Sequence, residues 1–327
     1  MTEETFAGKL AVVTGGGSGM GRELVRQLAA QGCSVAACDI NAESVAETAA
    51  LARAAADDRV LVTSHACDVA DEAQVLRFRD ELLKAHDTDH VDLVFSNAGI
   101  GGAGSFVCDT REDWERTFAI DFWGVYYCAR AFLPLLIASG DGILVNTSSV
   151  SGFWASLGPS MPNSAYSTAK FAVKGLTEAL IEDLRTNAPE VTVAVVMPGH
   201  VGTDIVANSR RILGHPGPEQ MSADELEEAR PALVRLGLPV EDASVDELRQ
   251  AVLKLESAFK DKAPLSAAAA ATIILDGVRA GAWRILVGDD AHGVDRAVRA
   301  YPEVAYDYAE LAKAAAAARE AAGESGR

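Results

Sequence analysis

The sequence has little positive charge, few aromatic side chains and no long uninterrupted apolar run. Its 327 residues carry 29 lysine and arginine side chains against 47 aspartate and glutamate side chains, a formal net charge of −18. A field of that sign repels nucleic acid and anionic membrane surfaces unless a basic patch opposes it, and the sequence has no such patch. No run reaches the roughly 20 uncharged apolar residues that cross a bilayer. We therefore expect no nucleic-acid or membrane partner.

Signals for secretion, disulfide bonding and metal binding are also missing. The acidic start MTEET has neither the basic residues nor the apolar centre of a secretory signal. The five cysteines form no CxxC pair, and the six histidines form no HxxxH or HExxH pattern. These absences predict a cytoplasmic protein with reduced structural thiols and no transition-metal site.

The sequence does contain a regular alternation of short apolar segments with longer amphipathic ones. Candidate strands cover 10–14, 34–39, 60–64, 91–96, 142–147, 191–197 and 284–287; candidate helices cover 21–31, 42–56, 72–86, 111–138 and 165–186. The short segments are apolar nearly throughout, as expected for strands covered on both faces. The expected fold class is α/β, a doubly wound (Rossmann) parallel sheet of about seven strands with helices on both faces.

The alternation stops between residues 204 and 264. This stretch has no strand-like run, and two Ser-x-x-Glu motifs that begin at Ser222 and Ser244 predict two capped helices. The chain then returns to a last strand and ends in an Ala/Glu-rich segment. We predict a single Rossmann-type domain over 1–327, a helical substrate lid inserted at 204–264, and a C-terminal helical extension at 301–327 whose end is frayed.

A glycine-rich loop, Thr14–Gly21 (TGGGSGMG), lies directly between the first strand and the first helix. Glycines at this junction let the chain turn sharply and let backbone N–H groups approach a pyrophosphate, which the helix N-terminus also attracts. The loop could instead be a plain flexible turn, but its position favours a dinucleotide site.

Asp39 ends the second strand, where a carboxylate accepts hydrogen bonds from adenosine ribose hydroxyls and repels a 2′-phosphate. The neighbouring positions Cys38, Ile40 and Asn41, and Ser18 in the loop, supply no compensating cation. This pattern predicts NAD rather than NADP. The alternative is that Asp39 only caps the following turn.

Two further segments follow strands at the same predicted edge of the sheet. Asp68-Val69 follows the third strand and Asn97-Ala98-Gly99 follows the fourth. Ligands of doubly wound sheets bind at the carboxyl ends of the strands. We expect Asp68 to accept a hydrogen bond from the adenine amino group and the small residues 98 and 99 to pass close to the ribose.

Taken in order, these motifs resemble the short-chain dehydrogenase/reductase family. The match includes the glycine-rich loop, Asn97-Ala-Gly99, Ser149, Tyr166-x-x-x-Lys170 and Pro198-Gly199, and it spans residues 6 to 203. The resemblance implies that Pro198, Gly199, Val201 and Thr203 hold the nicotinamide end of the cofactor. The cofactor residues that we expect are Gly15, Ser18, Gly19, Met20, Gly21, Asp39, Ile40, Asp68, Val69, Asn97, Ala98, Gly99, Tyr166, Lys170, Pro198, Gly199, Val201 and Thr203.

Tyr166 and Lys170 are four residues apart and therefore share one helix face. A tyrosine titrates near pH 10 in water, and an adjacent ammonium and an oxidised nicotinamide both favour the phenolate. We expect the pKa of Tyr166 to be lowered, so that the phenol acts as the acid/base on an alcohol. The resemblance adds that Lys170 binds the nicotinamide ribose and that Ser149 hydrogen-bonds the substrate oxygen; the role of Ser148 stays open.

Asp121 stands where the family usually has an asparagine that helps to hold a water beside the lysine. Because much of that role belongs to the backbone carbonyl, an aspartate can substitute for it, and its charge would strengthen the ammonium of Lys170. The opposite outcome, a lysine held away from the ribose, is also open. We expect an active enzyme with Asp121 in the catalytic group.

The segment between Ser149 and Tyr166 is longer than is usual for the family, and it carries Phe153 and Trp154. These two side chains either form a wall of the substrate pocket or pack at an interface. His200 is expected to be a solvent-exposed loop residue. The long lid with its apolar helix faces suggests a bulky, apolar or cyclic substrate.

The sequence therefore predicts an NAD-dependent oxidoreductase that interconverts a secondary alcohol and a ketone, and that assembles as a homodimer or homotetramer. The C-terminal extension is expected to pack on a neighbouring subunit. Two alternatives remain: an epimerase or dehydratase of the same fold with bound NAD, and an NAD-binding regulatory protein whose catalysis Asp121 has impaired.

Overall fold

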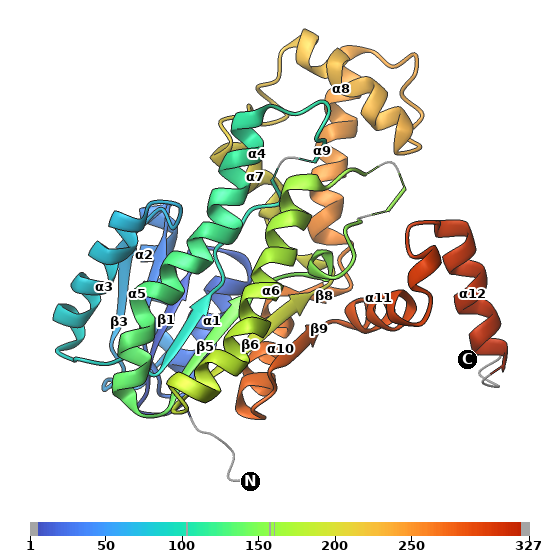
Figure 1. Cartoon of the computed structure of the whole chain (residues 1–327). Helices are drawn as coiled ribbons and strands as arrows, with labels where there is room; N and C mark the ends of the chain where they lie inside the picture. The colour runs from blue at the N-terminus through green and yellow to red at the C-terminus, as the bar shows by residue number, and fades with distance from the viewer. Residues whose placement is uncertain (1–5, 103, 157, 160, 322–327) are drawn as a thin grey trace.

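A seven-stranded, all-parallel sheet forms the centre of the molecule, in the order β3-β2-β1-β4-β5-β6-β9 (Figure 1). The computed structural model describes residues 6–102, 104–156, 158–159 and 161–321. The strands are β1 Leu10–Thr14, β2 Ser34–Asp39, β3 Val62–Ala66, β4 Leu93–Ser96, β5 Gly142–Thr147, β6 Val191–Pro198 and β9 Arg284–Val287. The predicted doubly wound sheet is confirmed. The acidic start and the expected frayed end lie outside the described residues.

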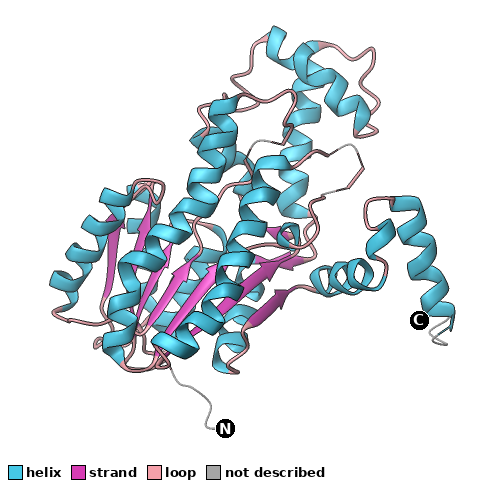
Figure 2. Ribbon diagram, in the orientation of Figure 1, coloured by secondary structure: helices cyan, strands magenta, loops and turns pink. Residues whose placement is uncertain are grey.

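Helices cover both faces of the sheet, and each face has its own apolar core (Figure 2). Helices α1 (Gly19–Ala30), α2 (Ala42–Ala55) and α10 (Ala267–Arg279) pack on one face, and α3 (Glu72–His86), α5 (Gly124–Ser139) and α6 (Ser164–Asn187) pack on the other. In β1, Ala11 and Val13 enter the first core while Leu10 and Val12 enter the second. This alternation explains why the strand is apolar at every position.

The helix expected at 111–138 is interrupted. Helix α4 (Arg111–Phe118) passes into a short π-helix, Ala119–Trp123, before α5 begins at Gly124. A π-turn inserts one extra residue into a helix and is often found at functional sites. Here it carries Asp121, the residue that departs from the family pattern.

The run Arg111–Ser139 is, by length and composition alone, apolar enough to cross a membrane. Half of its most apolar window is buried inside the structure, where α5 packs against β4, β5 and α3. This is the pattern of a core helix.

The lid has three helices, one more than predicted: α7 (Ile205–Ile212), α8 (Ala223–Arg235) and α9 (Val245–Asp261). Both predicted capping boxes are present at the starts of α8 and α9. Figure 1 shows α8 and α9 raised above the sheet, and they enclose a small separate core. The members of that core are Leu226, Leu233, Val240, Leu248 and Val252. At the base, β7 (Val201–Gly202) pairs in parallel with β8 (Leu265–Ser266).

The C-terminal segment leaves β9 and forms α11 (Asp289–Ala300), a 3-10 turn at Pro302–Val304 and α12 (Tyr308–Ala321), which projects from the body (Figure 1). It contacts the chain's own segment after β5. The Trp154 indole N–H donates to the Ala305 carbonyl at 2.8 Å, and the Tyr306 hydroxyl accepts from the Ala155 amide at 3.2 Å. The Tyr308 hydroxyl bonds the Ser156 hydroxyl. The hydroxyls of Tyr306 and Tyr308, in the extension that is expected to pack on a neighbouring subunit, thus have hydrogen-bond partners within the chain.

The separate lid core predicts that the lid can loosen while the sheet stays folded. Leu248 is fully buried in that core, whereas Leu255 on the same helix is 43% exposed. Leu248→Ala should weaken the lid core by about 2–5 kcal/mol and speed hydrogen exchange in α8 and α9, with exchange in β1 and β4 unchanged. Leu255→Ala is the matched control, and equal effects of the two changes would contradict a separate lid core.

Candidate active site

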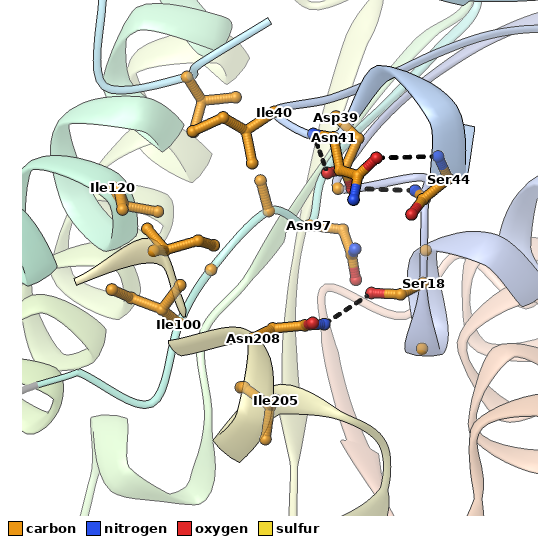
Figure 3. Close-up of a pocket in the computed structure, with 18 of the residues that line it drawn as sticks. Ser18, Asp39, Ile40, Asn41, Ser44, Asn97, Ile100, Ile120, Ile205 and Asn208 are labelled. Carbon is orange, nitrogen blue, oxygen red and sulfur yellow. Dashed lines mark hydrogen bonds between the residues drawn. The ribbon is translucent and has the colours of Figure 1, made fainter. Parts of the chain in front are cut away.

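An open cleft of about 330 Å³ lies at the carboxyl edge of β1, β2 and β4 (Figure 3). The strand order reverses between β1 and β4, which is where doubly wound sheets bind ligands. The predicted cofactor residues that line it are Gly15, Ser18, Gly19, Met20, Gly21, Asp39, Ile40, Asp68, Val69, Asn97, Ala98, Gly99 and Thr203. Pro198, Gly199, Val201, Tyr166 and Lys170 are not among its lining residues. They belong to its surroundings and not to its wall.

The glycine-rich loop has the shape of a cradle that side chains would fill. Gly15 has φ +66°, and a Cβ there would lie 2.8 Å from the Ala98 Cα. A Cβ on Gly21 would lie 2.0 Å from the Gly15 carbonyl oxygen. The loop is tied to β4 through Thr14, whose hydroxyl accepts from the amides of Asn97 and Ala98, both at 3.0 Å. These close approaches form a cradle at the N-terminus of α1, which suits an anion such as a pyrophosphate. The Gly16 and Gly17 amides themselves donate to the Cys38 carbonyl and the Asp39 Oδ2.

Asp39 closes the turn after β2, which is one of the two roles that the sequence left open, and its position leaves the other possible. Its Oδ1 accepts from the Asn41 amide at 2.9 Å, which closes the turn after β2, and its Oδ2 accepts from the Gly17 amide at 3.0 Å. The residue also lines the cleft (Figure 3). Each carboxylate oxygen has a further lone pair for a ribose hydroxyl.

Asp68 has partners that the sequence did not indicate. The Arg116 guanidinium donates to its Oδ2 at 2.7 Å, and the Ala70 amide donates to its Oδ1 at 3.0 Å. An adenine amino group would therefore share Asp68 with a cation from α4. Arg116 itself lines the cleft.

Helix α7 also lines the cleft and had been assigned only to the lid. The Asn208 side-chain amide donates to the Ser18 hydroxyl at 3.2 Å (Figure 3). The Ser209 hydroxyl accepts from the Gly101 amide at 2.7 Å. The lining residues that sequence reasoning missed are Gly17, Arg22, Asn41, Ser44, Cys67, Ile100, Arg116, Ile120, Asp204, Ile205, Asn208, Arg211 and Ile212. Gly17 lies inside the predicted glycine-rich loop and Asn41 follows Asp39 closely, so the sequence signal covered their segments, whereas Arg22 follows the last loop glycine directly.

The catalytic candidates converge beside Gly99. The end of β5 supplies Ser149, which is 7% exposed, and α6 supplies Tyr166 and Lys170. The neighbouring Ser148 hydroxyl donates to the Lys170 carbonyl at 2.7 Å, so Ser148 anchors α6. The Ser149 hydroxyl accepts from the Ser151 amide at 3.1 Å and also hydrogen-bonds the Tyr166 phenol.

Lys170 is buried, with 3% exposure, between three groups. Its Nζ donates to the Thr147 carbonyl at 3.2 Å, lies 3.5 Å from the Asp121 Oδ1, and lies 5.4 Å from the centroid of the Tyr166 ring. The ammonium is therefore close to the phenol, and a carboxylate shares it.

Burial raises the pKa of the Tyr166 phenol above its usual value. Lys170 and the Ser149 hydroxyl act in the lowering direction, while the charge of Asp121 raises the pKa further. This direction is opposite to the lowered pKa that the sequence predicts, because burial outweighs the Lys170 ammonium and Asp121 offsets part of the ammonium's charge.

Asp121 is fully buried, and its Oδ1 accepts from the Ile100 amide at 2.9 Å. Its Oδ2 has no hydrogen-bond partner among the described residues. Burial raises the pKa of this carboxyl to about 6, against the lowering effects of Lys170 and the Ile100 amide. The carboxylate thus reaches Lys170, as the sequence suggested, but it loses much of its charge in mildly acidic solution.

Phe153 and Trp154 are directed to the C-terminal part of the chain. The guanidinium of Arg284 lies 5.6 Å over the Phe153 ring, and the Trp154 ring is 6.1 Å from that of Tyr308. Neither residue lines the cleft. These contacts lie within the chain, so they correspond neither to a pocket wall nor to an interface with a second copy.

His200 is partly buried, so the prediction of a solvent-exposed residue is wrong. Its amide donates to the Asp290 Oδ2 at 2.6 Å, and its Nε2 donates to the Phe259 carbonyl in α9 at 2.6 Å. The ring also packs on Phe259, with centroids 4.4 Å apart. Through these contacts His200 connects the loop after β6 to helix α9 of the predicted lid.

Comparisons with known proteins agree with this geometry. A family model described as short chain dehydrogenase matches residues 9–213. A putative oxidoreductase, SadH, of Mycobacterium tuberculosis is 40% identical over 205 residues, which cover 63% of this chain and 71% of that protein. Levodione reductase of Leifsonia aquatica is 32% identical over 69% of this chain and 82% of its own length.

A solved structure extends the likeness to nearly the whole chain. A short chain dehydrogenase/reductase from Burkholderia phymatum, crystallised in complex with NAD, superposes with a TM-score of 0.71 at 27% identity. The match covers 92% of this chain and 96% of the other.

The buried carboxyl of Asp121 predicts a specific pH dependence of stability. Between about pH 4 and pH 6 the folded chain keeps a proton that the unfolded chain has lost, so rising pH destabilises the fold through this group. The size is on the order of 3 kcal/mol, at 1.36 kcal/mol per pKa unit. In Asp121→Asn this component should vanish, whatever constant offset the lost Lys170 contact adds. Urea unfolding from pH 4 to pH 7 measures it, and the exposed Asp58→Asn is the control. Parallel pH curves for Asp121→Asn and the parent would refute the assignment.

Proposed function

This chain belongs to the short-chain dehydrogenase family and is an oxidoreductase, and we propose that it interconverts a secondary alcohol and a ketone with NAD. The observation that supports the proposal is the convergence of Ser149, Tyr166 and Lys170 beside a cleft with a glycine cradle at its mouth. This arrangement supports the proposed roles of Tyr166 as the acid/base, Lys170 as the cation and Ser149 as the hydroxyl donor.

The residues of the cleft fit a dinucleotide. The glycine cradle and the N-terminus of α1 suit a pyrophosphate, and the Asp39 carboxylate suits an unphosphorylated adenosine ribose. Thr203 and the loop after β6 would hold the nicotinamide end. When bound, the cofactor supplies or accepts the hydride.

In the proposed mechanism, Tyr166 exchanges the proton and Ser149 steadies the substrate oxygen. A phenol whose pKa burial has raised is in the correct form to donate a proton to a ketone oxygen. In the direction of alcohol oxidation the same group must first lose its proton, which Lys170 assists and Asp121 opposes. We therefore propose that the geometry favours ketone reduction at neutral pH.

For the substrate we propose a bulky apolar or cyclic ketone or alcohol. Ile100, Ile205 and Ile212 give the cleft an apolar wall, and the lid above it is long. The likeness to a levodione reductase supports a ketone substrate. The packing of Phe153 and Trp154 on the C-terminal part removes them from this argument.

Assembly and location complete the proposal. We propose a homodimer or homotetramer in the cytoplasm that acts as one Rossmann-type domain with its lid. Trp123, just before α5, is 41% exposed, and Phe171, on α6, is 42% exposed. Exposed large apolar side chains of this kind are what an interface between copies would require. The cysteines at positions 33, 38, 67, 108 and 128 are unpaired, which suits a reducing compartment.

Tyr166→Phe tests the chemistry. It should lower kcat by about 10²–10⁴-fold while NAD binding, measured by calorimetry, stays within about threefold. Tyr126→Phe on α5 is the control for loss of a phenol outside the site. NADH formation with a panel of secondary alcohols also separates a dehydrogenase from an epimerase or dehydratase, which makes no net NADH. Turnover that is unchanged in Tyr166→Phe would exclude the mechanism.

The pH profile tests the opposing effect of Asp121. The rate of alcohol oxidation should rise with pH because the phenol must ionise, and Asp121→Asn should move the rising limb to lower pH by up to about one unit. Asp58→Asn should leave the limb in place. A limb that does not move in Asp121→Asn would show that this carboxylate does not influence Tyr166. A protein with only a regulatory role would oxidise no alcohol, so that no pH profile of the rate could be measured.

A further inference from the structure

Arg22 brings a positive charge to the cleft next to the glycine-rich loop. It lines the cleft from the first turns of α1, and its side chain is about one quarter exposed. Its Nε and Nη2 both donate to the Gly17 carbonyl, at 3.1 and 2.8 Å. Its Nη2 also donates to the Glu47 Oε2 at 2.6 Å.

A single peptide group joins this cation to the residue that selects the cofactor. The Gly17 amide donates to the Asp39 Oδ2 while the Gly17 carbonyl accepts from Arg22. The Thr48 hydroxyl of α2 also approaches the Gly17 carbonyl, at 3.5 Å. Gly17 is tightly enclosed, because a Cβ there would lie 2.9 Å from the Asp39 carboxylate. Asp39 and Arg22 therefore occupy two sides of one rigid turn.

The other cleft arginines have different partners. Arg116 pairs with Asp68, and Arg211 donates to the Asn208 amide oxygen at 3.0 Å. Among the described lining residues, Arg22 is the arginine whose hydrogen bonds share a peptide group with Asp39. A 2′-phosphate on a ribose held by Asp39 would therefore lie about one peptide group away from this guanidinium.

We propose that Glu47 is a second determinant of cofactor choice, because it holds and neutralises the Arg22 guanidinium that would otherwise bind a 2′-phosphate. The inference rests on the proposed function, which places the adenosine ribose at Asp39. With both carboxylates present, the turn has one cation against two anions. Removal of Asp39 alone leaves a neutral Arg22–Glu47 pair, whereas removal of both carboxylates leaves a guanidinium that keeps its bond to the Gly17 carbonyl and has neither carboxylate to neutralise it, a group well suited to a phosphate.

The pair lies at the surface, since Glu47 is 60% exposed on its side chain. Such pairs contribute little to stability and are screened by salt. Glu47→Gln should therefore fold normally, and its effect should appear in the binding of a dianionic phosphate and weaken at high ionic strength.

The experiment compares two probes that differ only in the 2′-phosphate: adenosine 5′-monophosphate and adenosine 2′,5′-bisphosphate. Their Kd values are measured by calorimetry in low salt for the parent, Glu47→Gln, Asp39→Asn and the double variant. The preference for the bisphosphate should rise about 3- to 10-fold in Glu47→Gln. It should rise by more in the double variant than the product of the single changes, because only there is the guanidinium free of both carboxylates.

Glu43→Gln is the matched control, since it removes the same charge from the same helix, four residues from Glu47, and Glu43 is an exposed residue. Arg22→Met in the double variant should abolish the gain. An equal gain in Glu43→Gln, or a gain that survives Arg22→Met, overturns the proposal by showing a general charge effect.

The binding data distinguish an error in the role of Glu47 from an error in the proposed cofactor site. If the parent binds the monophosphate and the preference does not move in Glu47→Gln or in the double variant, Glu47 has no part in cofactor choice and the proposed NAD site stands. If neither probe binds to the parent, both the proposed cofactor site and the role of Glu47 are wrong.

Discussion

The buried contact between Asp121 and Lys170 is the constraint around which the site is arranged. Both groups are almost completely removed from water, and their charged atoms are 3.5 Å apart. Burial of two charges costs several kcal/mol, which only close partners offset. The partners come from three directions: the Ile100 amide, the Thr147 carbonyl and the ion pair itself.

That contact also explains a glycine and a distortion nearby. A Cβ at Gly99 would lie 2.6 Å from the Asp121 Oδ1 and 3.1 Å from the Lys170 Nζ, so the chain after β4 can pass over the ion pair only at a glycine. The π-turn between α4 and α5 places Asp121 at the same point. The Asn97-Ala98-Gly99 turn therefore lines the cleft, and at Gly99 it also packs against the candidate catalytic residues Asp121 and Lys170.

The strands of the sheet could be predicted from the sequence because burial on both faces leaves a plain signal, as in β1, and the capping boxes of α8 and α9 are local. The π-turn was not predictable, since its residues have the same apolar composition as an ordinary helix. Helix α7 was missed because its first residue follows a loop and no side-chain cap marks its start. The roles of three residues depend on partners that are distant in the sequence, which the spacing within one motif does not reveal. The partner of His200 is 59 residues away, that of Arg22 is 25 residues away and that of Trp154 is 151 residues away.

The net charge of the chain repels an anionic ligand, whereas the residues of the cleft attract one. A net charge of −18 repels a dinucleotide, whose pyrophosphate is itself anionic. The cleft gathers Arg22, Arg116 and Arg211 around the cradle and adds the N-terminus of α1. Two of these arginines are each paired with a carboxylate, so their charge is reduced without being removed. Attraction of the proposed pyrophosphate would therefore rest mainly on the N-terminus of α1 and the third arginine, which act at short range and are less sensitive to the field of the whole chain. In the proposed site the anion would be held by geometry, and the selectivity for the ribose end would depend on the carboxylates beside it, Asp39 and Glu47.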